Sequence, residues 1–187
     1  MNILQIGCHV GDDDHSELIK TCESGVLIDA NKKCVKEAEK QYKDVKNITY
    51  ETLAIIPVDI GGVEINLFRE DDKETSPWAS VNPNFVAAHC HHTNLKSFKC
   101  KTETLSNLLR KYPKTDTLII DTEGLDFLNI ISIEQDLFES IKTLTFEHIH
   151  CDGIVKQGPK LECLIRFLQH MGFKSVKEET YNLVFSK

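Results

Sequence analysis

The chain has 187 residues, of which 41% are hydrophobic and 27% charged, and this length suits one domain with a sizeable core. Its net charge of −7 argues against a general binder of nucleic-acid backbones, which would need a basic stripe. No run approaches the ~18 apolar residues of a membrane span, and the opening MNILQIGCHVG lacks the features of a secretory signal. We therefore expect a single cytoplasmic domain over residues 1–187, with no general binding to nucleic acids or membranes.

The seven cysteines include no Cys-x-x-Cys pair, so a zinc site of that type has no support. Their odd number and scattered spacing favour reduced thiols in a cytoplasm-like compartment. We expect neither a structural metal nor a disulfide to hold the fold.

Strand-like and helix-like segments alternate from the first residues onward, which is typical of an α/β domain with a parallel sheet. A first helix is expected at about residues 14–22, capped by Asp12 or Asp13, and a second has its apolar face within residues 34–42. The first three expected strands are residues 2–6, 26–29 and 48–53.

The pattern changes after the third strand. Residues 54–68 have two strand-like arms around residues 59–62, which predicts a hairpin. Residues 69–95 are polar and irregular, with Pro77 and Pro83, and predict a long functional or mobile loop.

The α/β pattern returns in the second half of the chain. A short helix is expected around Leu105 and Leu109, and a longer one over residues 161–171 that ends at Gly172. The remaining expected strands are residues 117–121, residues 143–148 and a closing hairpin within residues 173–187.

The segment LQIGCHVGDD places Gly7 and Gly11 after a strand and before a helix, where free backbone N–H groups can meet a polar ligand. The spacing is G-x-x-x-G, which differs from the dinucleotide fingerprint G-x-G-x-x-G. A tight turn without a ligand is the alternative. Asp29 ends the next strand, where an acid can accept hydrogen bonds from ribose hydroxyls. We favour ribose binding over the alternative that Asp29 only caps the following helix.

The segment TLIIDTEGLD places three carboxylates, Asp121, Glu123 and Asp126, directly after a buried strand. Buried charges need a partner or a function. Ligands of open α/β sheets lie beyond the carboxyl ends of the strands, so we expect these acids to face a ligand crevice.

The chain resembles the FkbM family of S-adenosylmethionine-dependent methyltransferases nearly from end to end. The segments that carry the resemblance are LQIGCHVGDD, VLIDANKKCVKEAEKQY, LIIDTEGLD, LTFEHIH and LIRFLQHMGFKSVKEETYNLVF. The most specific is LIIDTEGLD, which matches a strand followed by I-D-x-E-G-x-D/E. The resemblance implies an α/β, Rossmann-like class I methyltransferase fold. Its sheet would be mostly parallel and seven-stranded with an antiparallel last strand, in a three-layer α/β/α sandwich.

The resemblance also implies S-adenosylmethionine as cofactor. The loop from Gly7 to Gly11 would approach its methionine part, Asp29 would hold the ribose, and Ala54 would lie near the adenine. Gln5 stands where many class I methyltransferases carry an acid. The cofactor contacts implied in this way are Gln5, Gly7, Cys8, His9, Gly11, Asp29, Ala30, Ala54 and Asp121.

Asp121 and Glu123 are the first candidates for a general base, because neighbouring carboxylates raise one another's pKa. The alternative is that they only orient loops or the cofactor. His148, at the end of the strand at 143–148, is a further candidate base, although a histidine that is merely hydrogen-bonded at a strand end is the stronger interpretation.

Two features of the polar segment remain open. The run HCHH at residues 89–92 favours a solvated or acceptor-side loop over a metal site, because adjacent residues rarely converge on one ion. Trp78 is expected either to wall the acceptor pocket or to anchor its loop.

The leading functional hypothesis is O-methylation of a small-molecule or glycan hydroxyl, with a nitrogen acceptor as a variant. The alternative is a cofactor-binding module with little catalysis of its own that acts with a partner. A chain that starts directly at the first strand favours the module, and the intact IDTEGLD segment disfavours it. A nicotinamide dehydrogenase is disfavoured by the glycine spacing.

Overall fold

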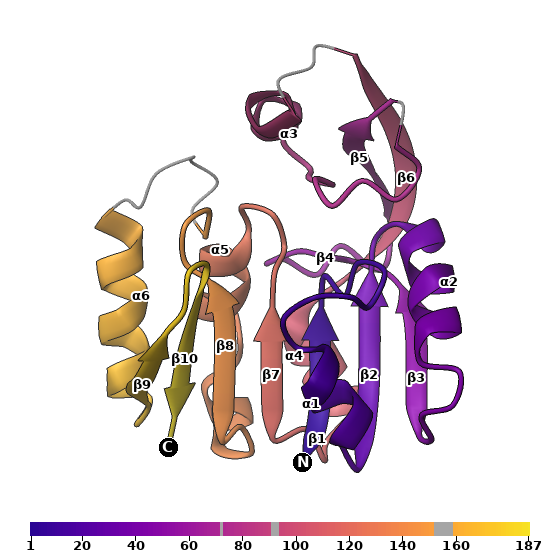
Figure 1. Cartoon of the computed structure of the whole chain (residues 1–187). Coiled ribbons are helices and arrows are strands. Elements are labelled where there is room, and N and C mark those ends of the chain that lie inside the picture. Colours follow the sequence, from indigo (N-terminus) through magenta and orange to yellow (C-terminus); the bar gives the residue numbers. More distant parts are fainter. Residues whose placement is uncertain (72, 91–93, 152–158) are drawn as a thin grey trace.

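The computed structural model describes residues 1–71, 73–90, 94–151 and 159–187. Its centre is a seven-stranded sheet in the order β3-β2-β1-β7-β8-β10-β9 (Figure 1). All neighbours from β3 to β8 pair in parallel, and β10 runs antiparallel to both β8 and β9. The strands are β1 (Asn2–Ile6), β2 (Ser24–Asp29), β3 (Ile48–Thr52), β7 (Thr117–Ile120), β8 (Thr143–Glu147), β9 (Lys174–Glu178) and β10 (Asn182–Ser186). The predicted mostly parallel sheet with an antiparallel last strand is confirmed.

Alternation along the buried strands divides the core into two layers. Ile3 and Ile119 face one side, where they pack with residues of α1 (Ser16–Thr21) and α2 (Lys32–Gln41). Leu4 and Ile120 face the other side, where they pack with residues of three further helices. These are α4 (Leu105–Lys111), α5 (Asp126–Ile131) and α6 (Pro159–His170). The three-layer α/β/α sandwich is therefore present, and each fully buried Leu or Ile contributes about 1.5–3 kcal/mol to it.

A second sheet rises above the carboxyl ends of the main strands (Figure 1). Its strands lie in the order β4-β6-β5, and the chain forms one helix between β5 and β6. Its elements are β4 (Ala54–Ile55), β5 (Glu64–Glu70), α3 (Pro83–Cys90) and β6 (Leu95–Glu103). We call β5, α3, β6 and the residues that the structure describes between them the accessory region.

The accessory region corrects two predictions. The hairpin expected over residues 54–68 does not form, because β4 and β5 each pair with β6 and not with each other. The irregular loop expected over residues 69–95 contains the end of β5 and the whole of α3. Pro83 had indicated a loop, yet proline suits the first position of a helix because that N–H needs no partner.

The other elements follow the prediction closely, including the closing hairpin of β9 and β10. The first helix begins at Ser16, and neither Asp12 nor Asp13 caps it with a side-chain bond. Instead, Asp13 Oδ1 accepts the backbone N–H of His15 at 2.9 Å in the turn before the helix. Within the described residues, no helix is both long enough and apolar enough to cross a membrane.

Candidate active site

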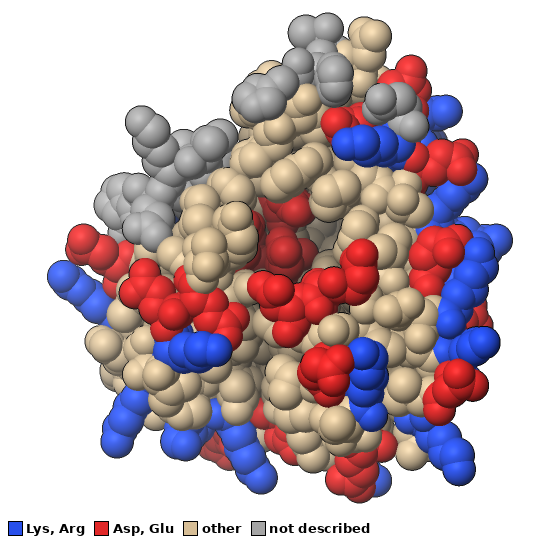
Figure 2. Space-filling view, in the orientation of Figure 1, with Lys and Arg blue, Asp and Glu red and all other residues tan. Residues whose placement is uncertain are grey.

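A cavity of about 400 Å³ lies at the carboxyl ends of β1, β2, β7 and β8, beneath the accessory region. Figure 2 shows acidic side chains on the floor and lower rim of this hollow, with Lys and Arg on the outer surface. No Lys or Arg is among the described residues that line it. The lining carboxylates are Asp13, Asp14, Asp29, Asp121, Glu123 and Glu147, and the lining histidines are His9, His15 and His150.

Gly7 brings the turn after β1 against the end of β7. Its φ of +76° lies in the left-handed region, and a Cβ built on it would stand 1.9 Å from the carbonyl oxygen of Asp121. Only glycine permits this approach without a backbone shift. The turn is held further by the N–H of Gly7, which donates to the carbonyl of Ile28 at 2.8 Å. Sequence reasoning located this turn correctly, although the contact with Asp121 was not predictable.

Asp29 supports the loop that follows Gly7. Its Oδ2 accepts the backbone N–H of His9 at 3.0 Å, and its Oδ1 accepts that of Asn31 at 2.7 Å. The helix α2 is capped by Asn31, whose side chain accepts the N–H of Lys33 at 3.1 Å. Asp29 is therefore not the N-cap of α2, so the alternative interpretation of this residue is wrong. Burial raises the pKa of Asp29, and the two N–H donors oppose that rise.

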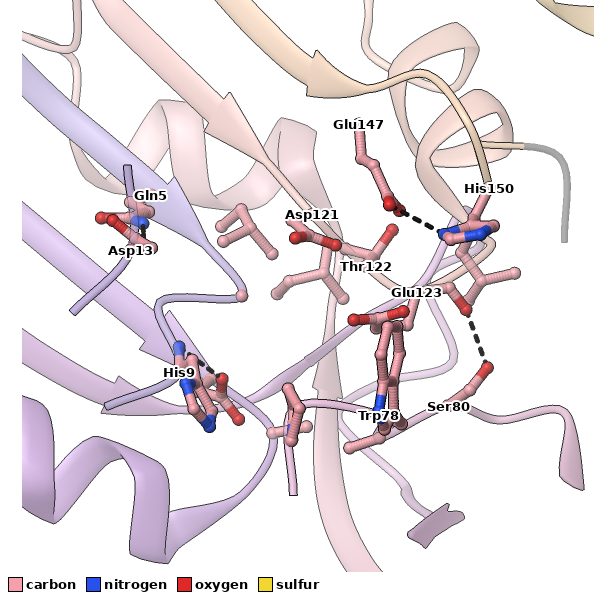
Figure 3. Close-up of a pocket in the computed structure, with 18 of the residues that line it drawn as sticks. Gln5, His9, Asp13, Trp78, Ser80, Asp121, Thr122, Glu123, Glu147 and His150 are labelled. Atoms are coloured by element: carbon pink, nitrogen blue, oxygen red, sulfur yellow. Dashed lines mark hydrogen bonds and ion pairs between the residues drawn. The ribbon is translucent and has the colours of Figure 1, made fainter. Parts of the chain in front are cut away.

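Asp13 is a site residue that the sequence analysis missed. Gln5 Nε2 donates to Asp13 Oδ2 at 2.5 Å, so an acid from the next loop reaches the end of β1 beside Gln5 (Figure 3). Burial raises the pKa of this carboxyl, and its hydrogen bonds oppose the rise. The run of three aspartates after Gly11 was the available signal, but only the loop conformation shows which one turns inward.

Seven of the nine residues implied as cofactor contacts line the cavity, namely Gln5, Gly7, His9, Asp29, Ala30, Ala54 and Asp121. Cys8 and Gly11 do not. Cys8 is completely buried in the core layer beneath the loop. The carbonyl of Gly11 accepts the hydroxyl of Tyr42 at 2.5 Å. These two residues shape the loop from behind.

The acidic loop after β7 divides its three carboxylates between two roles. Asp126 is fully buried, and its Oδ1 accepts the N–H of Thr122 at 2.8 Å and the hydroxyl of the same residue at 3.1 Å. It therefore holds the turn, whereas Asp121 and Glu123 line the cavity. Glu123 has a φ of +51°, an uncommon conformation for a residue with a side chain, and its carbonyl accepts the hydroxyl of Ser80 at 2.9 Å.

Burial raises the pKa of both Asp121 and Glu123 well above the usual range, and the charges of neighbouring carboxylates, Glu147 among them, raise it further. Burial likewise raises the pKa of Asp126 to about 7. One oxygen of each of these acids has no hydrogen-bond partner among the described residues. A carboxyl with a raised pKa, facing a cavity, has the properties of a general acid or base.

The end of β8 supplies Glu147 and His150 to the cavity, whereas His148 is not among its lining residues. Alternation was expected to separate Glu147 from His148, and it does so. The N–H of His148 donates to the carbonyl of Tyr181 at 2.9 Å, and its Nε2 lies 3.4 Å from the carbonyl of Glu179. The catalytic role predicted for His148 gains no support from this position. Glu147 and His150, joined at 2.8 Å (Figure 3), replace it as candidates.

Aromatic rings of the accessory region meet His150 above the cavity. Trp78 lines the cavity and stacks on His89, with ring centroids 4.9 Å apart. His89 belongs to α3, so this part of the HCHH run is helical and not a loop, while residues 91 and 92 lie outside the described residues. The Nε2 atoms of His89 and His150 are 3.0 Å apart. Trp78 therefore walls the cavity, as one of its two interpretations held.

The accessory region is attached at both ends of the cavity. At one end His9 Nε2 donates to the carbonyl of Thr75 at 2.8 Å, and Asn31 Nδ2 donates to that of Glu74 at 2.8 Å. At the other end are the contacts of Ser80 and His89 described above. These attachments close the cavity over the ends of the strands.

Comparison with solved structures finds the same fold among methyltransferases. Methyltransferase FkbM from Methylobacillus flagellatus KT aligns with a TM-score of 0.54 and 10% identity, over 100% of this chain and 43% of its own. Magnesium protoporphyrin IX methyltransferase from Synechocystis PCC 6803, solved with bound SAM, gives a TM-score of 0.49 and 14% identity over 99% and 69% of the two chains. No protein-family profile and no curated protein sequence matches the chain. At these identities the likeness shows the fold alone, and the chain spans less than half of the FkbM protein.

Proposed function

We propose that this protein is an S-adenosylmethionine-dependent methyltransferase. The observation that carries the proposal is a cavity at the carboxyl ends of the strands with six lining carboxylates and no Lys or Arg among the described lining residues. A nicotinamide dinucleotide would bring a negatively charged pyrophosphate into this field. S-adenosylmethionine brings a sulfonium and an ammonium group, which outweigh its single carboxylate, so an acidic cavity attracts it.

The residues of the β1 and β2 ends fit this cofactor. Asp29 keeps free lone pairs on both oxygens and would accept the ribose hydroxyls. Gly7 would let the backbone approach the ligand closely, and Ala54, which lines the cavity, would lie near the adenine. Asp13 would bind the ammonium group from beside Gln5, and so provides the acid that many class I methyltransferases carry at the position of Gln5.

The acceptor enters from the β7 and β8 end. When bound, the cofactor supplies an electrophilic methyl group to the acceptor oxygen, and the electron pair of the broken bond stays on the sulfur as a neutral thioether. The hydroxyl proton passes to Glu123 or Asp121, which line the cavity and whose pKa is raised by burial and by the neighbouring carboxylates. Orientation of the two reactants supplies most of the remaining acceleration.

The acceptor in this proposal is a hydroxyl of a small molecule or glycan. A cavity of about 400 Å³ is near the lower limit for one drug-sized ligand, so only a small part of the acceptor enters beside the cofactor. Phosphorylated acceptors would be repelled by the carboxylates. Membership of the FkbM family and a cytoplasmic location belong to the same proposal.

The test is transfer of isotopically labelled methyl groups from S-adenosylmethionine to a panel of polyhydroxylated small molecules and glycans. We expect acceptor-dependent label in a product that is stable to base, as an ether is. Label found only in carboxyl esters or amines would contradict the O-directed part of the proposal. Cofactor binding without transfer to any acceptor, together with a stable protein partner, would support the binding-module alternative.

A further inference from the structure

Three donor groups from separate parts of the β7 and β8 loops converge at the acceptor end of the cavity. Glu123, Glu147 and His150 each offer one ligand atom, and these atoms lie within 4.8 Å of one another. Figure 3 shows Glu147 and His150 in contact and Glu123 close to them. We propose that these three side chains bind a divalent metal cation, which would also contact the acceptor.

The hydrogen bonds around His150 need one hydrogen more than two neutral imidazoles and a carboxylate supply. A chain of contacts runs from the carbonyl of Phe85 to His89 Nδ1 (2.8 Å), from His89 Nε2 to His150 Nε2 (3.0 Å), and from His150 Nδ1 to Glu147 Oε1 (2.8 Å). Each contact needs one hydrogen, which makes three. Two neutral imidazoles and one carboxylate carry only two. The chain of contacts therefore needs an additional proton, or a cation in place of the hydrogen at the contact between His150 and Glu147.

Unpartnered oxygens beside this pair favour the cation. Glu147 Oε2 and Glu123 Oε2 are buried and have no hydrogen-bond partner among the described residues, and Glu147 is only 7% exposed. A proton on the His150–Glu147 contact would leave both of these oxygens unsatisfied, whereas a metal ion accepts several ligands at once. The 2.8 Å edge between His150 Nδ1 and Glu147 Oε1 is also close to the roughly 3 Å spacing of neighbouring ligands around an ion with ~2.1 Å bonds.

His89 completes the arrangement from α3. A metal-bound histidine usually donates its second ring N–H to an acceptor that fixes the tautomer and the ring orientation. His150 Nε2 faces His89 Nε2, and His89 Nδ1 is already committed to the carbonyl of Phe85. The His89 lone pair therefore accepts from His150 Nε2–H, which leaves His150 Nδ1 free to bind the ion.

The donor set indicates the class of metal. Two carboxylates and one imidazole suit Mn²⁺ or Zn²⁺ better than Ca²⁺ or Mg²⁺, which prefer oxygen donors alone. Three protein ligands leave coordination positions for the acceptor. If the proposed methyl transfer is correct, a cation here binds the acceptor hydroxyl and lowers its pKa, as metal ions do for bound water. Asp121 is then the proton acceptor, because Glu123 is bound to the ion. Binding of the cation itself does not depend on that function.

The test is titration of the tag-free, metal-stripped protein with Mn²⁺, followed by the loss of the free-ion electron paramagnetic resonance signal and by calorimetry. We expect one saturable site per chain and release of about one proton, measured in buffers with different ionisation enthalpies. Glu147→Gln and Glu123→Gln should each weaken binding at least about 100-fold, and His89→Leu about 10- to 100-fold. Asp44→Asn, which changes an exposed acid away from the cavity, should keep the affinity for Mn²⁺.

Thermal unfolding of each variant without metal controls for loss of the fold. The inference is overturned if neither Mn²⁺ nor Zn²⁺ binds saturably to the parent protein, or if the two glutamine variants bind as tightly as it does. Cofactor titrations separate the two proposals. Mn²⁺ binding without S-adenosylmethionine binding would sustain the metal site and refute the methyltransferase. Binding of S-adenosylmethionine without binding of Mn²⁺ would sustain the methyltransferase and refute the metal site. A proton would then occupy the position proposed for the metal.

Discussion

At the β1 and β2 end of the cavity two carboxylates, Asp13 and Asp29, are held by hydrogen-bond donors of the protein, whereas at the β7 and β8 end three carboxylates each have an oxygen without a partner among the described residues. Asp29 accepts two backbone N–H groups, and Asp13 accepts the side chain of Gln5 and the backbone of His15. By contrast, Asp121, Glu123 and Glu147 each have a buried oxygen with no partner among the described residues. Both groups of acids line the same cavity, but they differ in how completely their oxygens are hydrogen-bonded.

This difference separates recognition from chemistry. A carboxylate that is already oriented by hydrogen bonds presents fixed lone pairs to a ligand, which is what binding of a ribose requires. A buried carboxylate oxygen without a donor gains a partner only when a proton, a cation or a substrate arrives. We therefore assign the cofactor to the first end, and the acceptor and the proton transfer to the second. The four predictions below test that division, from the largest expected effect to the smallest.

The strongest effect is expected at the unsatisfied end. At least one of Glu123→Gln and Asp121→Asn should lower turnover on an identified acceptor by about 10²–10⁴-fold, because a base contributes that much to the transition state. Their affinity for the cofactor should change far less, and steady-state kinetics beside calorimetry separates the two. Normal turnover in both variants, together with an inactive His148→Gln, would reverse our assignment.

The carboxyl of Asp126 should make stability depend on pH in an uncommon direction. Its pKa is about 7 in the fold, against ~3.9 in an unfolded chain, so the native state holds the extra proton between these values. Its contribution is therefore fully present below about pH 4 and is lost as the pH rises towards 7. Asp126→Asn, which keeps an acceptor for Thr122, should gain stability relative to the parent protein by up to about 4 kcal/mol between pH 4 and 8. Urea unfolding measures this, and parallel pH profiles would show that the carboxyl is not perturbed.

Gly7 and Gly61 form a matched pair for the contact between the two ends. Both glycines have a positive φ, +76° at Gly7 and +70° at Gly61. A Cβ added to Gly7 would lie 1.9 Å from the carbonyl oxygen of Asp121, whereas a Cβ added to Gly61 would have no atom within 4 Å. Gly61→Ala should cost about 1–2 kcal/mol of unfolding free energy, from backbone strain alone. Gly7→Ala should cost more than about 3 kcal/mol, or prevent folding. Equal losses in chemical denaturation would mean that the close approach of the β1 turn to β7 is not required.

The smallest effect is expected at the satisfied end. Asp29→Asn should weaken the affinity for the cofactor by roughly 10- to 100-fold, since a hydrogen bond to a charged group contributes about 1.5–3 kcal/mol. Turnover at saturating cofactor should stay near that of the parent protein. Asp44→Asn, which changes an exposed acid away from the cavity, is the control. Unchanged cofactor affinity in calorimetry would remove the ribose assignment.

The sequence predicted the satisfied end better than the unsatisfied one, for a physical reason. Gly7 and Asp29 each follow a buried apolar run, and the carboxyl ends of parallel strands meet at one edge of the sheet. Strand prediction therefore brought these two residues together without knowledge of any loop. Asp13 was not predicted as a site residue, because its place beside Gln5 depends on the conformation of the loop between β1 and α1.

The opposite end depends on contacts that leave little local pattern. His89 and His150 meet although 61 residues separate them, and the helix that carries His89 begins at a proline that had indicated a loop. Alternation separated Glu147 from His148 correctly, but only the position of the cavity shows which of the two faces it. The strand β6 was missed because its lysines interrupt any apolar run and its partners, β4 and β5, precede it by tens of residues.

The most direct test of the central claim is calorimetric titration of the protein with S-adenosylhomocysteine, S-adenosylmethionine and NAD under the same conditions. We predict one site for each of the two adenosyl ligands and no saturable binding of NAD. We also predict that either adenosyl ligand, at ~100 times its dissociation constant, stabilises the native state by about 2.7 kcal/mol. Binding of NAD with no binding of either adenosyl ligand would contradict the account, because the carboxylates would then tolerate a pyrophosphate and reject a sulfonium.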